Sequence, residues 1–331
     1  MPLRATRRRS SSEPRLLSIR SEVVRMEGET PAQRRREPRE SKEETSMPEL
    51  QTLMTGLVIG ESPRWHEGRL WFSNWGAQEI IAVDVWGNSE VVTRVPTTVP
   101  FSIDWLPDGR LLVVSGQEGL LLRREADGSL VTHADLRGLS NRPWNEIVVD
   151  GRGNIYVNSI CFQFGEEEFR PGILALVAPD GSVRQVADQI AFPNGMVVTP
   201  DNSTLIVAES FASRLTAFEI AADGSLSNRR VWAELGQGGD GICLDATGAV
   251  WCPAVKEGKS TCVRVREGGQ VLQRIELDRG CFACMLGGDD GKTLFMMAAE
   301  WHGTENMDVL FHSRTGQVLT ARAPAPHVGW P

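Results

Sequence analysis

The 331-residue chain lacks several features that would each indicate a particular class of protein. No stretch approaches 18 consecutive apolar residues, which excludes a transmembrane helix. Its six cysteines are too few for a disulfide-stabilised scaffold, so we expect free thiols, a reducing compartment and a cytoplasmic location. The net charge is −8, and no basic patch is visible beyond the N-terminal region. We therefore expect neither nucleic acid nor a membrane as a partner.

The N-terminal region differs in composition from the rest of the chain. Residues 1–46 carry 12 basic and 8 acidic side chains and show no apolar periodicity, whereas the other 285 residues carry 23 basic and 35 acidic ones. Such a segment buries too little apolar surface to offset the entropy lost on ordering. We predict that residues 1–46 are a disordered basic tail or a translated leader, and that residues 47–331 form one folded domain. The oligomeric state stays open.

Glycine and proline are abundant, with 33 and 18 residues, which favours many short strands joined by turns. A short apolar stretch, a turn and a second apolar stretch recur six times. The turn residues are 41 to 49 positions apart, at Gly68, Gly109, Gly153, Asn202, Gly248 and Gly291. A fixed period of this length is typical of a repeat architecture.

A second hairpin is expected after each of these, the last with its turn at Arg314 to Gly316. Six units of two hairpins predict an all-β fold, a six-bladed β-propeller of four-stranded antiparallel blades. Residues 50–58 precede the first unit and are expected to supply the outer strand of the last blade, which closes the ring. The signatures of WD repeats do not recur.

The repeat aligns six residues at the start of the innermost strands, where one mouth of the central channel is expected. They are Glu61, Phe101, Asn145, Asn194, Asp240 and Ala283. Asn and Asp often occur at such positions simply because they form turns. Four oxygen-bearing side chains in register, however, form a donor set suited to calcium, magnesium or manganese and less suited to zinc.

Four sequence blocks resemble the senescence-marker-protein/gluconolactonase (regucalcin-like) propellers over about residues 56 to 320. They are Gly60 to Trp65, Asn145-Glu146, Pro193 to Met196 and Gly239 to Gly241. The resemblance implies one divalent metal ion on the propeller axis, with Glu61, Asn145, Asn194 and Asp240 as ligands. It also implies lactone hydrolysis with Asp240 as the general base. Calcium is the first expectation, with magnesium, manganese or zinc as alternatives.

Loops on the same face are expected to form the wall of a site for a small lactone. The candidate substrate-binding residues are Trp75, Arg142, Trp144, Phe162, Glu209 and His302, and residues 158–170 are the candidate lid. Several family members bind sugar acids with an arginine two residues before the second-block Asn. Here Arg142 lies three residues before it, and the intervening Trp144 favours a flatter or more apolar substrate. Glu146 either orients Asn145 or lies on the surface.

The preferred hypothesis is therefore a metal-dependent lactone hydrolase. A metal-dependent phosphotriesterase or other esterase would need the same donor set. A non-catalytic propeller stabilised by its metal is a hypothesis of a different class. A synthase that forms carbon–carbon bonds on a similar propeller is a further alternative, and it would need an acid or base that does not bind metal.

Overall fold

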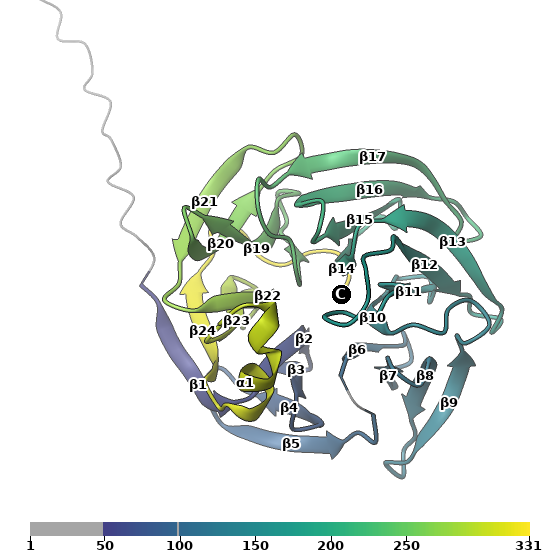
Figure 1. Ribbon diagram of the computed structural model, residues 1–331, viewed down its shortest axis with the longest axis horizontal. Helices are drawn as coiled ribbons and strands as arrows, with labels where there is room; N and C mark the ends of the chain where they lie inside the picture. The colour runs from purple at the N-terminus through teal and green to yellow at the C-terminus, as the bar shows by residue number, and fades with distance from the viewer. Residues whose placement is uncertain (1–48, 98) are drawn as a thin grey trace, which may run out of the picture. The chain divides into compact units, whose positions relative to one another are not determined.

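The computed structural model describes residues 49–97 and 99–331, so the prediction for residues 1–46 falls outside the described residues. Six four-stranded antiparallel sheets surround a central axis (Figure 1). The first three, from the inner strand outward, are β2 (Ile59–His66), β3 (Arg69–Trp75), β4 (Glu79–Val83) and β5 (Ser89–Arg94); β6 (Phe101–Trp105), β7 (Leu111–Ser115), β8 (Leu120–Arg124) and β9 (Leu130–Asp135); and β10 (Trp144–Val149), β11 (Ile155–Ser159), β12 (Gly172–Val177) and β13 (Val183–Ile190).

The other three sheets continue the ring and confirm the six-bladed propeller. They are β14 (Pro193–Val198), β15 (Thr204–Glu209), β16 (Arg214–Ile220) and β17 (Leu226–Glu234); β18 (Cys243–Leu244), β19 (Val250–Lys256), β20 (Lys259–Val265) and β21 (Val271–Glu276); and β22 (Gly280–Gly287), β23 (Thr293–Ala299), β24 (Gly316–Arg322) and β1 (Gln51–Leu57). Neighbouring inner strands contact one another around the whole circle.

The predicted turns account for this regularity. All six turn residues of the first hairpins, Asn202 included, have positive φ values between 57° and 84°. Glycine adopts this conformation without steric cost, and asparagine tolerates it better than most residues. The local sequence therefore sets where each inner hairpin reverses.

The ring closes as expected, because β1 pairs with β24 and places Gln51 opposite Thr320. One prediction for the last blade is wrong. Residues Arg314 to Gly316 do not form a hairpin turn but lead into β24, since β1 already occupies the outermost position. The connection from β23 to β24 instead contains the 3₁₀ helix η1 (Thr304–Asn306) and the helix α1 (Met307–His312).

The hydrophobic core lies between the blades rather than at the axis. Leu112 and Val114 of the second blade, for example, pack with Trp144 and Ile147 of the third. At one end of the inner strands, Val198 and Asp245 form β-bridges to the C-terminal residues Trp330 and His327. The polar starts of the inner strands thus lie at the other end of the channel. Neither helix of the described chain has the length and apolar character needed to cross a membrane.

Candidate metal centre and active site

The inner strands bring the four predicted oxygen-bearing side chains to one cavity. Glu61 lies in β2, Asn145 in β10 and Asn194 in β14, while Asp240 precedes β18. All four line a cavity of about 1270 Å³. Cavities of about 300–1,000 Å³ hold drug-sized ligands, so this one has room for a small molecule and its substituents.

Two glycines allow the inner strands to approach closely enough for this arrangement. A Cβ at Gly195 would lie 2.5 Å from the backbone oxygen of Asp240, and a Cβ at Gly241 would lie 2.4 Å from the Cβ of Ala283. Any side chain at these positions would push neighbouring blades apart. The glycines that follow Asn194 and Asp240 in the sequence blocks are therefore required by the convergence of the strands.

Hydrogen bonds fix the orientation of both amide side chains. The Nδ2 of Asn145 donates to the backbone oxygen of Pro193 at 3.3 Å. The Nδ2 of Asn194 donates to Ser210 Oγ at 3.3 Å, and its side chain also hydrogen-bonds Asp240. Among the described residues no donor reaches either Oδ1. Both amides therefore keep an oxygen available to a ligand.

The two carboxylates are buried without a basic partner among the described residues. Burial, followed by the charges of Asp240 and Glu146, raises the pKa of Glu61 well above its usual range. Burial and then the charge of Glu146 raise the pKa of Asp240 to about 8, although the hydrogen bond from Asn194 opposes this shift. Within residues 49–97 and 99–331, neither carboxylate forms an ion pair with a basic side chain. Unpaired buried carboxylates are unfavourable unless they are protonated or bind a cation.

This donor set fits a hard divalent cation. It combines two carboxylates with two amide oxygens, which are the ligand types of calcium and magnesium. Three or more His, Cys, Asp or Glu side chains do not converge on a metal position anywhere in the described chain. A cation at this site would therefore depend on Asn145 and Asn194 as well as on the two acids.

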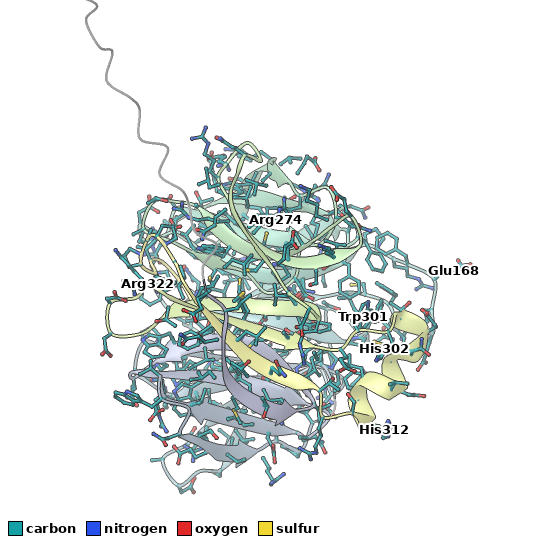
Figure 2. The ribbon with its side chains drawn as sticks, turned by 90° about the vertical axis from the view of Figure 1, so that its left-hand side faces the viewer. Glu168, Arg274, Trp301, His302, His312 and Arg322 are labelled. Carbon is teal, nitrogen blue, oxygen red and sulfur yellow. The ribbon has the colours of Figure 1, made fainter. Side chains whose placement is uncertain are left out.

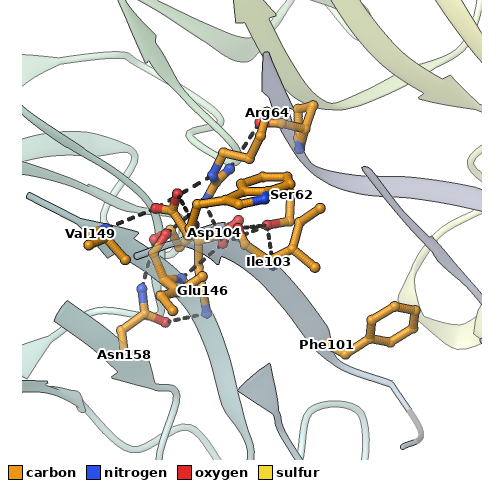
Figure 3. A network of polar contacts seen from close by, with 12 residues as sticks. Ser62, Arg64, Phe101, Ile103, Asp104, Glu146, Val149 and Asn158 are labelled. Atoms are coloured by element: carbon orange, nitrogen blue, oxygen red, sulfur yellow. Dashed lines mark hydrogen bonds and ion pairs between the residues drawn. The ribbon is translucent and has the colours of Figure 1, made fainter. Parts of the chain in front are cut away.

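Glu146 also lines the cavity, and it belongs to a buried polar network (Figure 3). Its Oε1 accepts hydrogen bonds from Ser62 Oγ at 2.9 Å and from Arg64 Nη2 at 3.2 Å. The guanidinium of Arg64 also donates to the backbone oxygen of Ile147 at 2.7 Å and lies 3.8 Å from Asp104. Burial, partly offset by Arg64, raises the pKa of Asp104 to about 6. Glu146 is only 5% exposed, so the alternative of a surface role is wrong.

Two of the six predicted substrate-binding residues line the cavity. Trp75, at the end of β3, donates its indole N–H to the backbone oxygen of Phe101 at 2.6 Å and presents its ring to the cavity wall. His302 lies at the rim, where its side chain is 51% exposed and its Nε2 is 3.7 Å from Glu300. Figure 2 shows Trp301 and His302 on the same side of the propeller as Glu168, which follows β11.

The other four do not line it, and each has a structural reason. Trp144 is fully buried, because side chains alternate along β10 and its neighbour Asn145 takes the side facing the axis. Phe162 is buried beneath other phenylalanine rings. Glu209 is enclosed and binds Arg214 and Arg229. Arg142 is held by Glu167 at 2.7 Å.

Sequence reasoning missed part of the wall. Met307, Leu310 and Phe311 of α1 line the cavity, and their spacing of three and four residues was a helical signal within the segment after β23. Phe192 also lines it, although it lies in a tight turn between two blades with no periodicity to indicate its role. The candidate lid contributes Gln163 and Phe164 to the wall.

Known proteins share both the sequence blocks and the fold. The family model described as SMP-30/Gluconolactonase/LRE-like region matches residues 59–300. The chain belongs to this family. Among its relatives, regucalcin of Xenopus laevis is 26% identical over 293 residues, which is 82% of this chain and 95% of that protein. The diisopropyl-fluorophosphatase of Loligo vulgaris is 24% identical over 190 residues, which is 51% of this chain and 60% of that protein.

Solved structures extend the likeness to three dimensions. A structure described as a gluconolactonase from Xanthomonas campestris matches with a TM-score of 0.67 at 23% identity, covering 84% of this chain and 90% of that one. At this identity the match shows the shared fold. The family membership confirms the resemblance predicted from the four sequence blocks.

Proposed function

We propose that this member of the SMP-30/gluconolactonase family is a divalent-metal-dependent hydrolase that opens a lactone. The observation that carries the proposal is the pair of buried, unpaired carboxylates, Glu61 and Asp240, beside two amides with available oxygens at the end of a cavity. The family description and the structural neighbour described as a gluconolactonase support this reaction class. Calcium is the expected cation, because all four donors are hard oxygens and one relative is a regucalcin.

In this proposal, four residues bind the cation and one of them, Asp240, also transfers a proton. Glu61, Asn145, Asn194 and Asp240 would hold the cation. When bound, the cation would supply a Lewis acid for the ester carbonyl. Asp240 accepts a proton from the attacking water, and the hydrogen bond from Asn194 orients its carboxylate and favours the ionised form. Arg64 keeps the charge of Glu146 paired.

A phosphotriester or another ester is the second candidate substrate class, since the diisopropyl-fluorophosphatase of Loligo vulgaris matches half of this chain. The same cavity and donor set would serve either reaction. The third candidate is a propeller that binds a metal for stability and does not catalyse hydrolysis.

We further propose that the protein acts on a small molecule, without nucleic acid or membrane partners. We also propose a cytoplasmic location, which its six free cysteines support.

The test compares D-glucono-1,5-lactone, aliphatic γ-lactones and a phosphotriester, each with calcium and with a chelator. We expect lactone hydrolysis that the chelator abolishes. Asp240→Asn should lower turnover by a hundredfold or more while the protein still folds, because a general base contributes about 10²–10⁴ in rate. Asp290→Asn, which alters an exposed ion pair with Arg322, is the matched control.

Each other outcome identifies an alternative. Hydrolysis of the phosphotriester alone favours the second candidate. Calcium-dependent thermal stability without hydrolysis of any compound favours the scaffold. Full turnover by Asp240→Asn on a confirmed lactone would remove Asp240 from its catalytic role.

A further inference from the structure

Five phenylalanine side chains form a continuous wall on one side of the cavity. They come from the loop after β11 and from the residues flanking β14 and β15, and they are Phe162, Phe164, Phe169, Phe192 and Phe211. Their contacting ring centroids lie 4.8 to 6.4 Å apart, which is the range of favourable aromatic contacts. Phe164, Phe192 and Phe211 line the cavity, and Phe162 packs against them from below. We call this set the phenylalanine wall.

The phenylalanine wall is held open to solvent. Phe211 is 51% exposed and Phe169 is 46% exposed, and clustered apolar rings at a cavity mouth mark a binding surface. Phe192 has a φ of 61°, a strained conformation for a bulky residue. Two hydrogen bonds hold it there, from the N–H of Ser210 to the oxygen of Phe192 and from the N–H of Phe211 to the oxygen of Ala191.

The phenylalanine wall lies beside Asn194, one of the four proposed metal ligands. Phe192 is two residues before Asn194, and Phe211 follows Ser210, whose hydroxyl accepts the hydrogen bond from Asn194. The rings therefore adjoin the position expected for the substrate carbonyl and offer an apolar surface to a substituent of the substrate. The opposite rim also carries an apolar ring among its charged side chains, because Trp301 is 41% exposed and packs edge-on against Phe282 at 5.8 Å.

Two basic side chains of the lining are already paired. Lys259 lies 3.2 Å from Glu276, and Arg279 lies 2.9 Å from Asp278. Apart from His302, these are the basic side chains in the described lining. A substrate carboxylate or phosphate would have to compete with Glu276 or Asp278 for these two basic side chains, so the cavity favours an uncharged molecule.

We propose that the substrate is a neutral lactone bearing an apolar alkyl substituent that packs against the phenylalanine wall. This inference rests on the proposed lactonase function and names its substrate class. A sugar lactone would place hydroxyl groups against rings that offer no hydrogen bonds, and would lose its bonds to water there. An alkyl chain gains from the same surface with each methylene that it buries.

The first experiment measures kcat/KM for γ-lactones from γ-butyrolactone to γ-decalactone and for D-glucono-1,5-lactone, with calcium-loaded protein. We expect kcat/KM to rise about threefold to fourfold per added methylene until the wall is covered, and the sugar lactone to be the poorest substrate. Phe211→Ser should reduce the preference for γ-decalactone over γ-butyrolactone by tenfold or more. Trp86→Ser removes an apolar ring that is 80% exposed away from the cavity, and it should leave the preference unchanged.

The second experiment separates this inference from the proposed function. Calorimetry measures binding of 2-heptylcyclopentanone, which has a carbonyl and a chain but no ester, and of cyclopentanone to wild-type protein and Phe211→Ser. Tighter binding of the longer ketone that Phe211→Ser weakens supports the apolar subsite even if no lactone is hydrolysed. Lactone hydrolysis with no chain-length dependence, or with a preference for the sugar lactone, overturns the inference and leaves the lactonase function standing. Equal binding of the two ketones also overturns it.

Discussion

Replacing Glu61 by glutamine should stabilise the metal-free protein and remove its response to calcium. Glu61 is 7% exposed, and the charge of Asp240 opposes its ionisation. The pKa of Asp240 is about 8, against 3.8 for a free carboxyl. Because both folded pKa values are raised, the metal-free fold loses stability as the pH rises through them. At 1.36 kcal/mol per pKa unit, ionising Asp240 alone costs on the order of 5 kcal/mol at pH 9.

A neutral amide in place of the Glu61 carboxylate removes one of the mutually repelling charges of Glu61, Asp240 and Glu146. We expect Glu61→Gln to gain about 2 kcal/mol at pH 9 in chelator, which corresponds to a Tm increase of about 4 °C or more. Calcium at about 100 times its Kd should stabilise the wild type by about 2.7 kcal/mol and should leave the variant almost unchanged.

Differential scanning fluorimetry with calcium and with chelator measures both effects. Glu67→Gln changes a carboxylate that is 77% exposed at the end of the same hairpin, and it serves as the control. A lower Tm of Glu61→Gln in chelator would show that the Glu61 carboxylate does not destabilise the metal-free protein. A full calcium response in the variant would show that Glu61 is not a ligand.

Two further predictions concern the buried network around Glu146. Arg64→Met leaves Glu146 and Asp104 without their guanidinium, and it should lower the free energy of unfolding in chemical denaturation by about 3–5 kcal/mol. Arg322→Met, at an exposed ion pair, should lower it by less than about 1 kcal/mol. Equal effects of the two substitutions would contradict this prediction. The pKa of Asp104 is about 6 when folded and 3.8 when free, so the stability from its proton is present below about pH 4 and lost as the pH rises through 6. The free energy of unfolding of wild type relative to Asp104→Asn should therefore fall by up to about 3 kcal/mol between pH 4 and pH 7, and parallel stability curves would contradict the assignment.

The repeat in the sequence determined the architecture, because turn residues and strand alternation act over a few neighbouring positions. Gly68 and Asn202 reverse the chain where they occur, and the similar spacings between the six turns favour one arrangement. Alignment of the repeat also placed Glu61 and Asp240 at the same channel end. The close approach of the strand that carries Asn194 to Asp240 depends on Gly195, which follows Asn194 in the same sequence block.

The tertiary structure alone decided which neighbouring side chains face the cavity. Arg142 is held by Glu167, 25 residues away, and does not line the cavity. The phenylalanine wall joins rings from two blades, and α1 takes the place of a predicted hairpin because the N-terminal strand fills the last blade. Local periodicity specifies strands and turns, whereas ion pairs and ring contacts form between segments that only folding brings together. The sequence by itself therefore determined the ring and the four polar donors, and the tertiary structure decided the apolar wall beside them.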